Sequence, residues 1–217
     1  MGRLPAAGPI VIPSAASLKL RWGDDVHEWS NVLTMRYSSP PTFGPGLAES
    51  VFTSLKSAAV TAGLMLHVAP EWSFLGVELK DINSANNPGY LSTGAAQAGS
   101  ATEASLPLSM AAEVSLRTAR AGRGYVGRFY MAGLSKGAQV DAFSYTTAAG
   151  DAIAAFLDAI RTSPPSGLQL ALGQRELQAG EDSHGNPMPP RPASAEPVTH
   201  IQITDYVFDT QRRRLHV

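Results

Sequence analysis

Residues 18–37, LKLRWGDDVHEWSNVLTMRY, decide the fold of this chain. Residues 18–22 and 31–37 are predicted strands, and the second carries two alternating sets of side chains, Val32, Thr34 and Arg36 against Leu33, Met35 and Tyr37. Alternation with a period of two is typical of a strand with two different faces. Gly23, Asp24 and Asp25 between the segments are turn-forming residues. The stretch therefore predicts two strands joined by a turn.

A helix is predicted over residues 47–62, after prolines and glycines at 40–46 break the chain. Its apolar residues recur at helical spacing: Leu47, Val51, Leu55, Ala58, Ala59 and Ala62. Gly63 follows as the residue that ends it. Two further strands are predicted at residues 64–68 and 72–79.

The second part of the chain opens with a long loop. Residues 81–105 are mostly Asn, Gly, Ala, Ser and Thr, and so long a loop inside one domain is usually functional or reaches a partner. The elements predicted after it are strands at 108–118 and 128–131, a helix at 148–161 capped by Thr147, a strand at 168–172, a proline-rich loop at 180–197 and a strand at 198–208.

Together these elements predict an α+β fold, mainly antiparallel β-sheet with two packed helices. The order strand, helix, strand, strand occurs over residues 31–80 and again over 113–208, so a duplicated unit is one interpretation. A single domain is expected over residues 17–217. Residues 1–16 are expected to form an extended arm, because prolines 5, 9 and 13 exclude a helix around the apolar stretch Ile10 to Ile12.

The composition limits the classes of function. The 217 residues are 44% hydrophobic and only 16% charged, with a formal net charge of −1, which does not favour a disordered chain or a uniformly basic nucleic-acid binder. A surface with so few charges indicates contact with copies or partners. No cysteine is present, so disulfides and thiolate chemistry are excluded. No apolar run is long enough to span a membrane.

Arginines cluster in two places. Arg117, Arg123 and Arg128 lie within twelve positions, and Arg212, Arg213 and Arg214 stand near the end of the sequence. Arginine is favoured at protein interfaces for its planar, multidentate guanidinium. With a net charge near zero, interface ion pairs are favoured over nucleic-acid binding. Ile10 and Ile12 of the arm are expected to add an apolar contact.

Catalytic, metal and cofactor sites are not expected. The five histidines are scattered, and the sequence GRGYVG at 122–127 precedes a strand, whereas a dinucleotide-binding GxGxxG motif opens a helix. Asp24, Asp25, His27 and Glu28 form the densest group of acid–base side chains and potential metal ligands. A hydrolase that uses Asp24, Asp25 and His27 is a weak alternative. In a turn, such residues usually serve the turn itself.

Aromatic residues support a different class of function, the binding of a glycan or another small ligand. Trp29, Trp72 and Tyr90 lie near turns or strand ends, where aromatic rings stack on sugars or anchor interfaces. A receptor-binding tip is one form that such a module takes. The alternative is that these rings close the ends of the core.

The sequence resembles a class of small bacteriophage virion proteins at two segments, residues 114–118, VSLRT, and 121–134, AGRGYVGRFYMAGL. In that class a strand with Leu-Arg-Thr is followed by a Gly-Arg-rich turn and then by the pattern Gly-Arg-hydrophobic-Tyr-x-x-Gly. The ending DTQRRR at 209–214 is similar to the ending of those sequences, whereas Ala132 stands where they have proline. The resemblance implies a structural subunit of a virion that contacts copies of itself and other virion proteins. It implies no catalytic residues.

Overall fold

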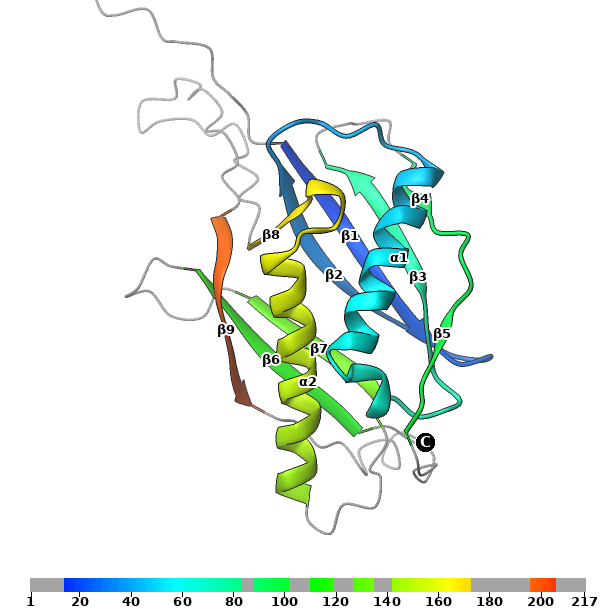
Figure 1. Ribbon diagram of the computed structural model, residues 1–217, viewed down its shortest axis with the longest axis vertical. Coiled ribbons are helices and arrows are strands. Elements are labelled where there is room, and N and C mark those ends of the chain that lie inside the picture. Colours follow the sequence, from blue (N-terminus) through cyan, green and yellow to red (C-terminus); the bar gives the residue numbers. More distant parts are fainter. Residues whose placement is uncertain are drawn as a thin grey trace, which may run out of the picture.

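The computed structural model describes residues 14–82, 88–101, 110–118, 127–134, 142–172 and 196–205. It has the α+β fold that the sequence predicts. Two helices lie side by side on one face of an antiparallel sheet (Figure 1). The hydrogen-bonded order of the described strands is β4-β3-β1-β2-β8-β9-β6-β7, and β5 also pairs with β3.

The first half of the molecule, residues 14–101, is called here the N-terminal unit. Its elements are β1 (Ser14–Gly23), β2 (Glu28–Tyr37), α1 (Pro45–Thr61), the 3₁₀ turn η1 (Leu64–Leu66), β3 (Ser73–Asp81), β4 (Tyr90–Leu91) and β5 (Gln97–Ala98). The strands β1 and β2 form a hairpin, and the chain returns through α1 to place β3 antiparallel to β1.

The second half, residues 110–205, is called the C-terminal unit. Its elements are β6 (Met110–Thr118), β7 (Gly127–Leu134), α2 (Ala142–Thr162), the 3₁₀ turn η2 (Pro165–Gly167), β8 (Gln169–Leu172) and β9 (Glu196–Asp205). The strand β6 pairs with β7, and after α2 the chain returns to place β9 antiparallel to β6. The two units therefore share the order strand, strand, helix, strand, except that the C-terminal unit has β8 between its helix and its last strand.

This repeat differs from the predicted order of strand, helix, strand, strand. The predicted strand at 64–68 is wrong: Gly63 takes the left-handed conformation, with φ +73°, and turns the chain into η1. Only Val68 in this segment makes a β-bridge, to Leu134 of β7. The alternation of apolar residues over so short a run also fits a tight turn whose side chains enter the core.

Other predicted boundaries also move. The helix α2 begins at Ala142, so Thr147 lies inside it and is not its N-cap. The strand β1 begins at Ser14, which assigns the last residues of the predicted arm, 14–16, to the sheet. Residues 1–13 lie outside the described part. The predicted loop at 81–105 contains the last residue of β3 and the two short strands β4 and β5. The last two residues of the predicted loop at 180–197 belong to β9.

One hydrophobic core joins the two units under the helices. The ring of Trp22 from β1 stacks on Phe74 of β3 at a centroid distance of 4.4 Å and meets Phe156 of α2 edge-on at 6.4 Å. These three side chains are almost fully buried. The even positions of β1 and the odd positions of β2 face this core. The helices therefore hold the two units together, and the opposite face of β1 to β3 carries polar side chains.

Candidate functional site

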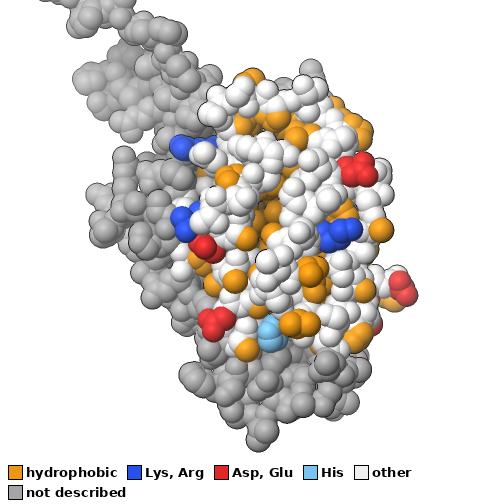
Figure 2. All heavy atoms as spheres, viewed as in Figure 1, with side chains coloured by type: hydrophobic (Ala, Val, Ile, Leu, Met, Phe, Trp, Pro, Cys, Tyr) orange, Lys and Arg blue, Asp and Glu red, His pale blue; other side chains and the backbone are white. Residues whose placement is uncertain are grey.

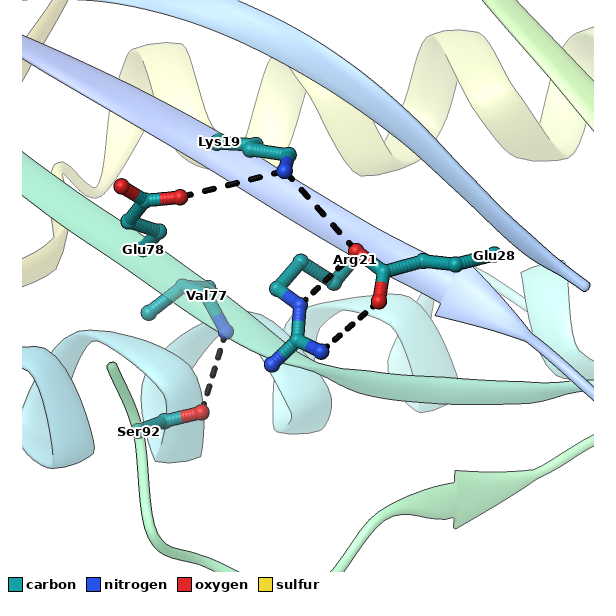
Figure 3. Close-up of polar contacts among 6 residues, drawn as sticks. All are labelled: Lys19, Arg21, Glu28, Val77, Glu78 and Ser92. Atoms are coloured by element: carbon teal, nitrogen blue, oxygen red, sulfur yellow. Dashed lines mark hydrogen bonds and ion pairs between the residues drawn. The ribbon is translucent and has the colours of Figure 1, made fainter. Parts of the chain in front are cut away.

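The outer edge of β3 is covered by the chain that follows it. Residues 88–101, called here the cover segment, run along this edge and contain β4 and β5 (Figure 1). The Ser92 N–H donates to the carbonyl of Val77 at 2.9 Å, and the Val77 N–H donates to Ser92 Oγ at 3.0 Å (Figure 3). At the other end the Gly99 N–H donates to the carbonyl of Trp72 at 2.7 Å. At these positions the cover segment supplies hydrogen-bond partners for the backbone of this edge.

The strand β9 lies between β8 and β6 in the hydrogen-bonded order of the sheet. Its residues 196–197 pair with β8 and its residues 198–205 pair with β6. The order ends at β7, which is therefore the other edge strand. Among the described strands only β6 pairs with β7, and a single bridge joins Leu134 of β7 to Val68.

Pro197 is the second residue of β9 and stands opposite Ala171. A proline has no N–H to donate to a neighbouring strand, so prolines in sheets are found at edges, strand starts and bulges. Pro197 therefore agrees with the start of β9 at this point of the chain.

A group of charged side chains lies on the sheet face away from the helices. Arg21 makes a bidentate contact with Glu28, at 2.9 Å from Nε and 2.7 Å from Nη2 (Figure 3). Lys19 Nζ bridges Glu28 and Glu78 at 3.9 and 3.8 Å. The hydrogen bond from Arg21 lowers the pKa of the Glu28 carboxyl, and the same bond raises the pKa of Arg21. These partly exposed contacts fix strand register and add little stability.

The acid–base group at the hairpin tip serves the turn. Asp24 Oδ1 accepts hydrogen bonds from the backbone N–H groups of Val26 and His27, and Oδ2 lies 3.3 Å from His27 Nδ1. The backbone bonds lower the pKa of Asp24, first that from His27 and then that from Val26. Asp24 is therefore held as a carboxylate by the turn that it caps. This geometry lets the β1–β2 ladder extend to the pair Gly23 and Glu28, beyond the predicted ends.

The predicted interface arginines fall mostly outside the described residues. Arg123, Arg212 to Arg214, Ile10 and Ile12 lie there. The backbone of Arg117 is in β6 opposite His200, and that of Arg128 is in β7 opposite Ser115. The structure thus brings Arg117 and Arg128 into one hairpin.

The three aromatic residues of the alternative function do not form one surface. Trp29, Trp72 and Tyr90 are half-buried and pack against the hydrophobic core. Trp29 stands opposite Trp22, which pairs with Phe74 at one end of β3. Tyr90 stands opposite Leu79, about 16 Å further along that strand. Their partial burial is typical of residues that close the ends of a core.

A shallow groove of about 500 Å³ runs between α1 and α2. Ser, Thr, Ala and Pro side chains line it, among them Ser54 and Ala58 of α1 and Ala155 and Ala159 of α2. None of its lining residues is charged, and charged side chains are sparse over the described part of this face (Figure 2). The groove supplies no acid, base or nucleophile beyond hydroxyls.

Comparison of the chain with models of protein families, with curated proteins and with solved structures found no match. In the described ranges, no three His, Asp or Glu side chains gather as ligands for a metal ion. No helix of the described part is long and apolar enough to cross a bilayer. The edge of β7, with which only β6 pairs among the described strands, is the feature on which a candidate function can be built.

Proposed function

We propose that this protein is a structural subunit of a phage-like virion that acts by self-assembly and by contact with other virion proteins. The observation that carries the proposal is the edge of β7, the last strand of the order, with which only β6 pairs among the described strands apart from the bridge between Leu134 and Val68. Exposed strand edges are templates for pairing with another chain, and most proteins protect them. The β3 edge of this same molecule is protected in that way, so the difference between the two edges supports an assembly role for β7.

Two features of the sequence add support. The segments at 114–134 and 209–214 resemble small bacteriophage virion proteins. The charged fraction of 16% leaves broad surfaces, including the helix face, with few side chains that oppose contact (Figure 2). Copies of the chain would meet through strand edges for affinity and through arginine and aromatic anchors for specificity. The predicted location is the virion, and no cofactor, metal or nucleic acid is needed for this role.

The mass of the purified protein, measured by light scattering at two salt concentrations, tests this function. A discrete oligomer or a large particle is the expected result. Dissociation at high salt would assign ion pairs, including those of the arginines, to the interface. A monodisperse monomer at high micromolar concentration in both salts would refute self-assembly.

A further inference from the structure

The sheet face away from the helices carries a row of four side chains across β4, β3, β1 and β2, called here the central row. Its members stand opposite one another in register: Leu91 opposite Glu78, Glu78 opposite Lys19, and Lys19 opposite Val32. Opposed residues of neighbouring antiparallel strands project to the same face of the sheet. In strand order, the central row is therefore apolar, acidic, basic and apolar.

Both apolar ends of the central row are exposed. Val32 is 64% exposed and Leu91 is 50% exposed, and they are two of the five large hydrophobic side chains that are exposed in the described part of the chain. Between them, Lys19 Nζ lies 3.8 Å from a carboxylate oxygen of Glu78 (Figure 3). The row thus has apolar ends and a charged centre that is neutral in sum.

This pattern is complementary to a second copy of itself. A two-fold axis parallel to the strands, between β1 and β3, reverses the order of the strands and keeps each residue at its position along them. When two such faces meet, Glu78 of one copy lies against Lys19 of the other, and Val32 lies against Leu91. Acid meets base and apolar meets apolar at all four positions, as a self-complementary two-fold interface requires.

The rows on either side allow the same approach. Arg21 stands opposite Gly76 of β3, and Ser17 stands opposite Lys80. The same axis places Arg21 against Gly76 of the second copy, where no side chain takes up space, and places Lys80 against Ser17. At these described positions no cation faces another cation. Two sheets can therefore pack here in the aligned manner, about 10 Å apart.

We infer that the outer face of β1 to β3 packs on the same face of a second copy of this chain, related by a two-fold axis, with the central row in the middle. The inference rests on the proposed function, because it names one contact of self-assembly, and it does not use the edge of β7. The three strands cover about 14 Å by 30 Å, less than the roughly 800 Å² that each partner contributes to a standard interface. The contact is therefore weak, and growth beyond pairs needs a second contact.

Opposite charge changes at the centre of the row test this contact in the full-length protein. Lys19→Glu leaves two acids in the row and Glu78→Lys leaves two bases, so each variant meets like charges when it pairs with itself. In a 1:1 mixture of the two variants, every acid of one faces a base of the other. Light scattering at low salt gives the apparent Kd for assembly, and urea denaturation shows that each variant is folded.

Each charge variant alone is expected to raise the apparent Kd about tenfold or more, and the mixture to return to within about threefold of the wild type. Mixing cannot repair an ion pair that acts only within one chain. If both charge variants lose assembly and the mixture does not regain it, the face-to-face contact is overturned and the proposed function stands.

Val32→Ser tests an apolar end of the row without a change of charge and does not depend on the folding of the charge variants. Its matched control is Val60→Ser on α1, which removes an exposed valine from the other side of the molecule. Val32→Ser is expected to weaken assembly several-fold, whereas Val60→Ser should assemble like the wild type. Equal assembly of both variants and the wild type would overturn the contact and leave the proposed function standing. A wild type that stays monomeric at high micromolar concentration would overturn both.

Discussion

The two units of this molecule are built in the same order and finished differently. In each, a hairpin is followed by a helix and by a strand that pairs with the first strand of the hairpin. The edge of β3 is covered by residues 88–101 of its own chain. In the C-terminal unit β9 lies between β8 and β6, and the edge strand is β7, with which only β6 pairs among the described strands. The same order of elements therefore leads to differently finished edges.

Gly99 gives the largest expected effect, because the cover segment depends on it. A Cβ at this position would collide with the backbone carbonyl oxygens of Val68 and Ala69. Gly99→Ala should force the segment away from β3 and break the bond from the Gly99 N–H to Trp72. We expect a loss of about 2–4 kcal/mol in the free energy of unfolding, measured by urea denaturation.

The matched control is Gly46→Ala in the first turn of α1, where nothing lies within 4 Å of an added Cβ. Alanine is the better helix former, so this variant should be as stable as the wild type or slightly more stable. If Gly99→Ala were equally harmless, the cover segment would not contribute to the stability of the β3 edge.

Ser92 tests the same edge more gently. Its hydroxyl accepts a hydrogen bond from the Val77 N–H in β3. Ser92→Ala leaves that partly buried donor without the hydroxyl, and such a loss costs about 1–2 kcal/mol. Thermal unfolding gives the size of the effect, and hydrogen exchange should show faster exchange at Val77 while β9 is unchanged. Ser54→Ala, on the exposed side of α1, controls for loss of a hydroxyl and should not destabilise the protein.

The sequence predicts some of the helices and strands of the two units and misses others. The alternation in residues 31–37 and the apolar stripe of α1 predict the α+β fold correctly. The first turns of α2 escape prediction because residues 142–147 include Phe, Ser, Tyr and Thr, all weaker helix formers than Ala or Leu. The strands β4 and β5 have two residues each, too few for a periodic signal. Their pairing with β3 depends on contacts that only the folded chain creates.

The candidate site escapes prediction for a related reason. The arginines and Ile10 to Ile12 are visible in the sequence, but an open edge is a property of the whole sheet. Nothing in residues 127–134 alone indicates that β7 is the last strand of the hydrogen-bonded order.

The residues that follow the two helices give a third comparison. After α1 the left-handed conformation falls on Gly63, with φ +73°, whereas after α2 it falls on Ser166, with φ +50°, and on Gly167. A side chain in this region costs free energy that glycine avoids. Ser166→Gly should therefore raise the free energy of unfolding by about 0.5–1 kcal/mol in urea denaturation. Gly63→Ala should lower it by about 1 kcal/mol, since its nearest neighbour is 3.9 Å away and only the backbone is strained. Changes of opposite sign in the free energy of unfolding would confirm that the left-handed backbone conformation causes both effects. Changes of the same sign would contradict it.

The smallest effect concerns the charged face of the N-terminal unit. Because Arg21 lowers the pKa of Glu28, this carboxylate stabilises the fold above its ordinary pKa, and the contribution is lost as the pH falls through about 4.5 and below. Glu28→Gln should cost about 0.5 kcal/mol at pH 7 and less at pH 3, because protonation of the carboxyl removes the same interaction from the wild type. Urea denaturation at both pH values measures this, with Glu71→Gln, an exposed carboxylate before β3, as the control. A cost that is equal at pH 3 and pH 7 would mean that Glu28 acts through packing, and that the register of β1 against β2 depends on the hairpin turn at Asp24 and on the buried face.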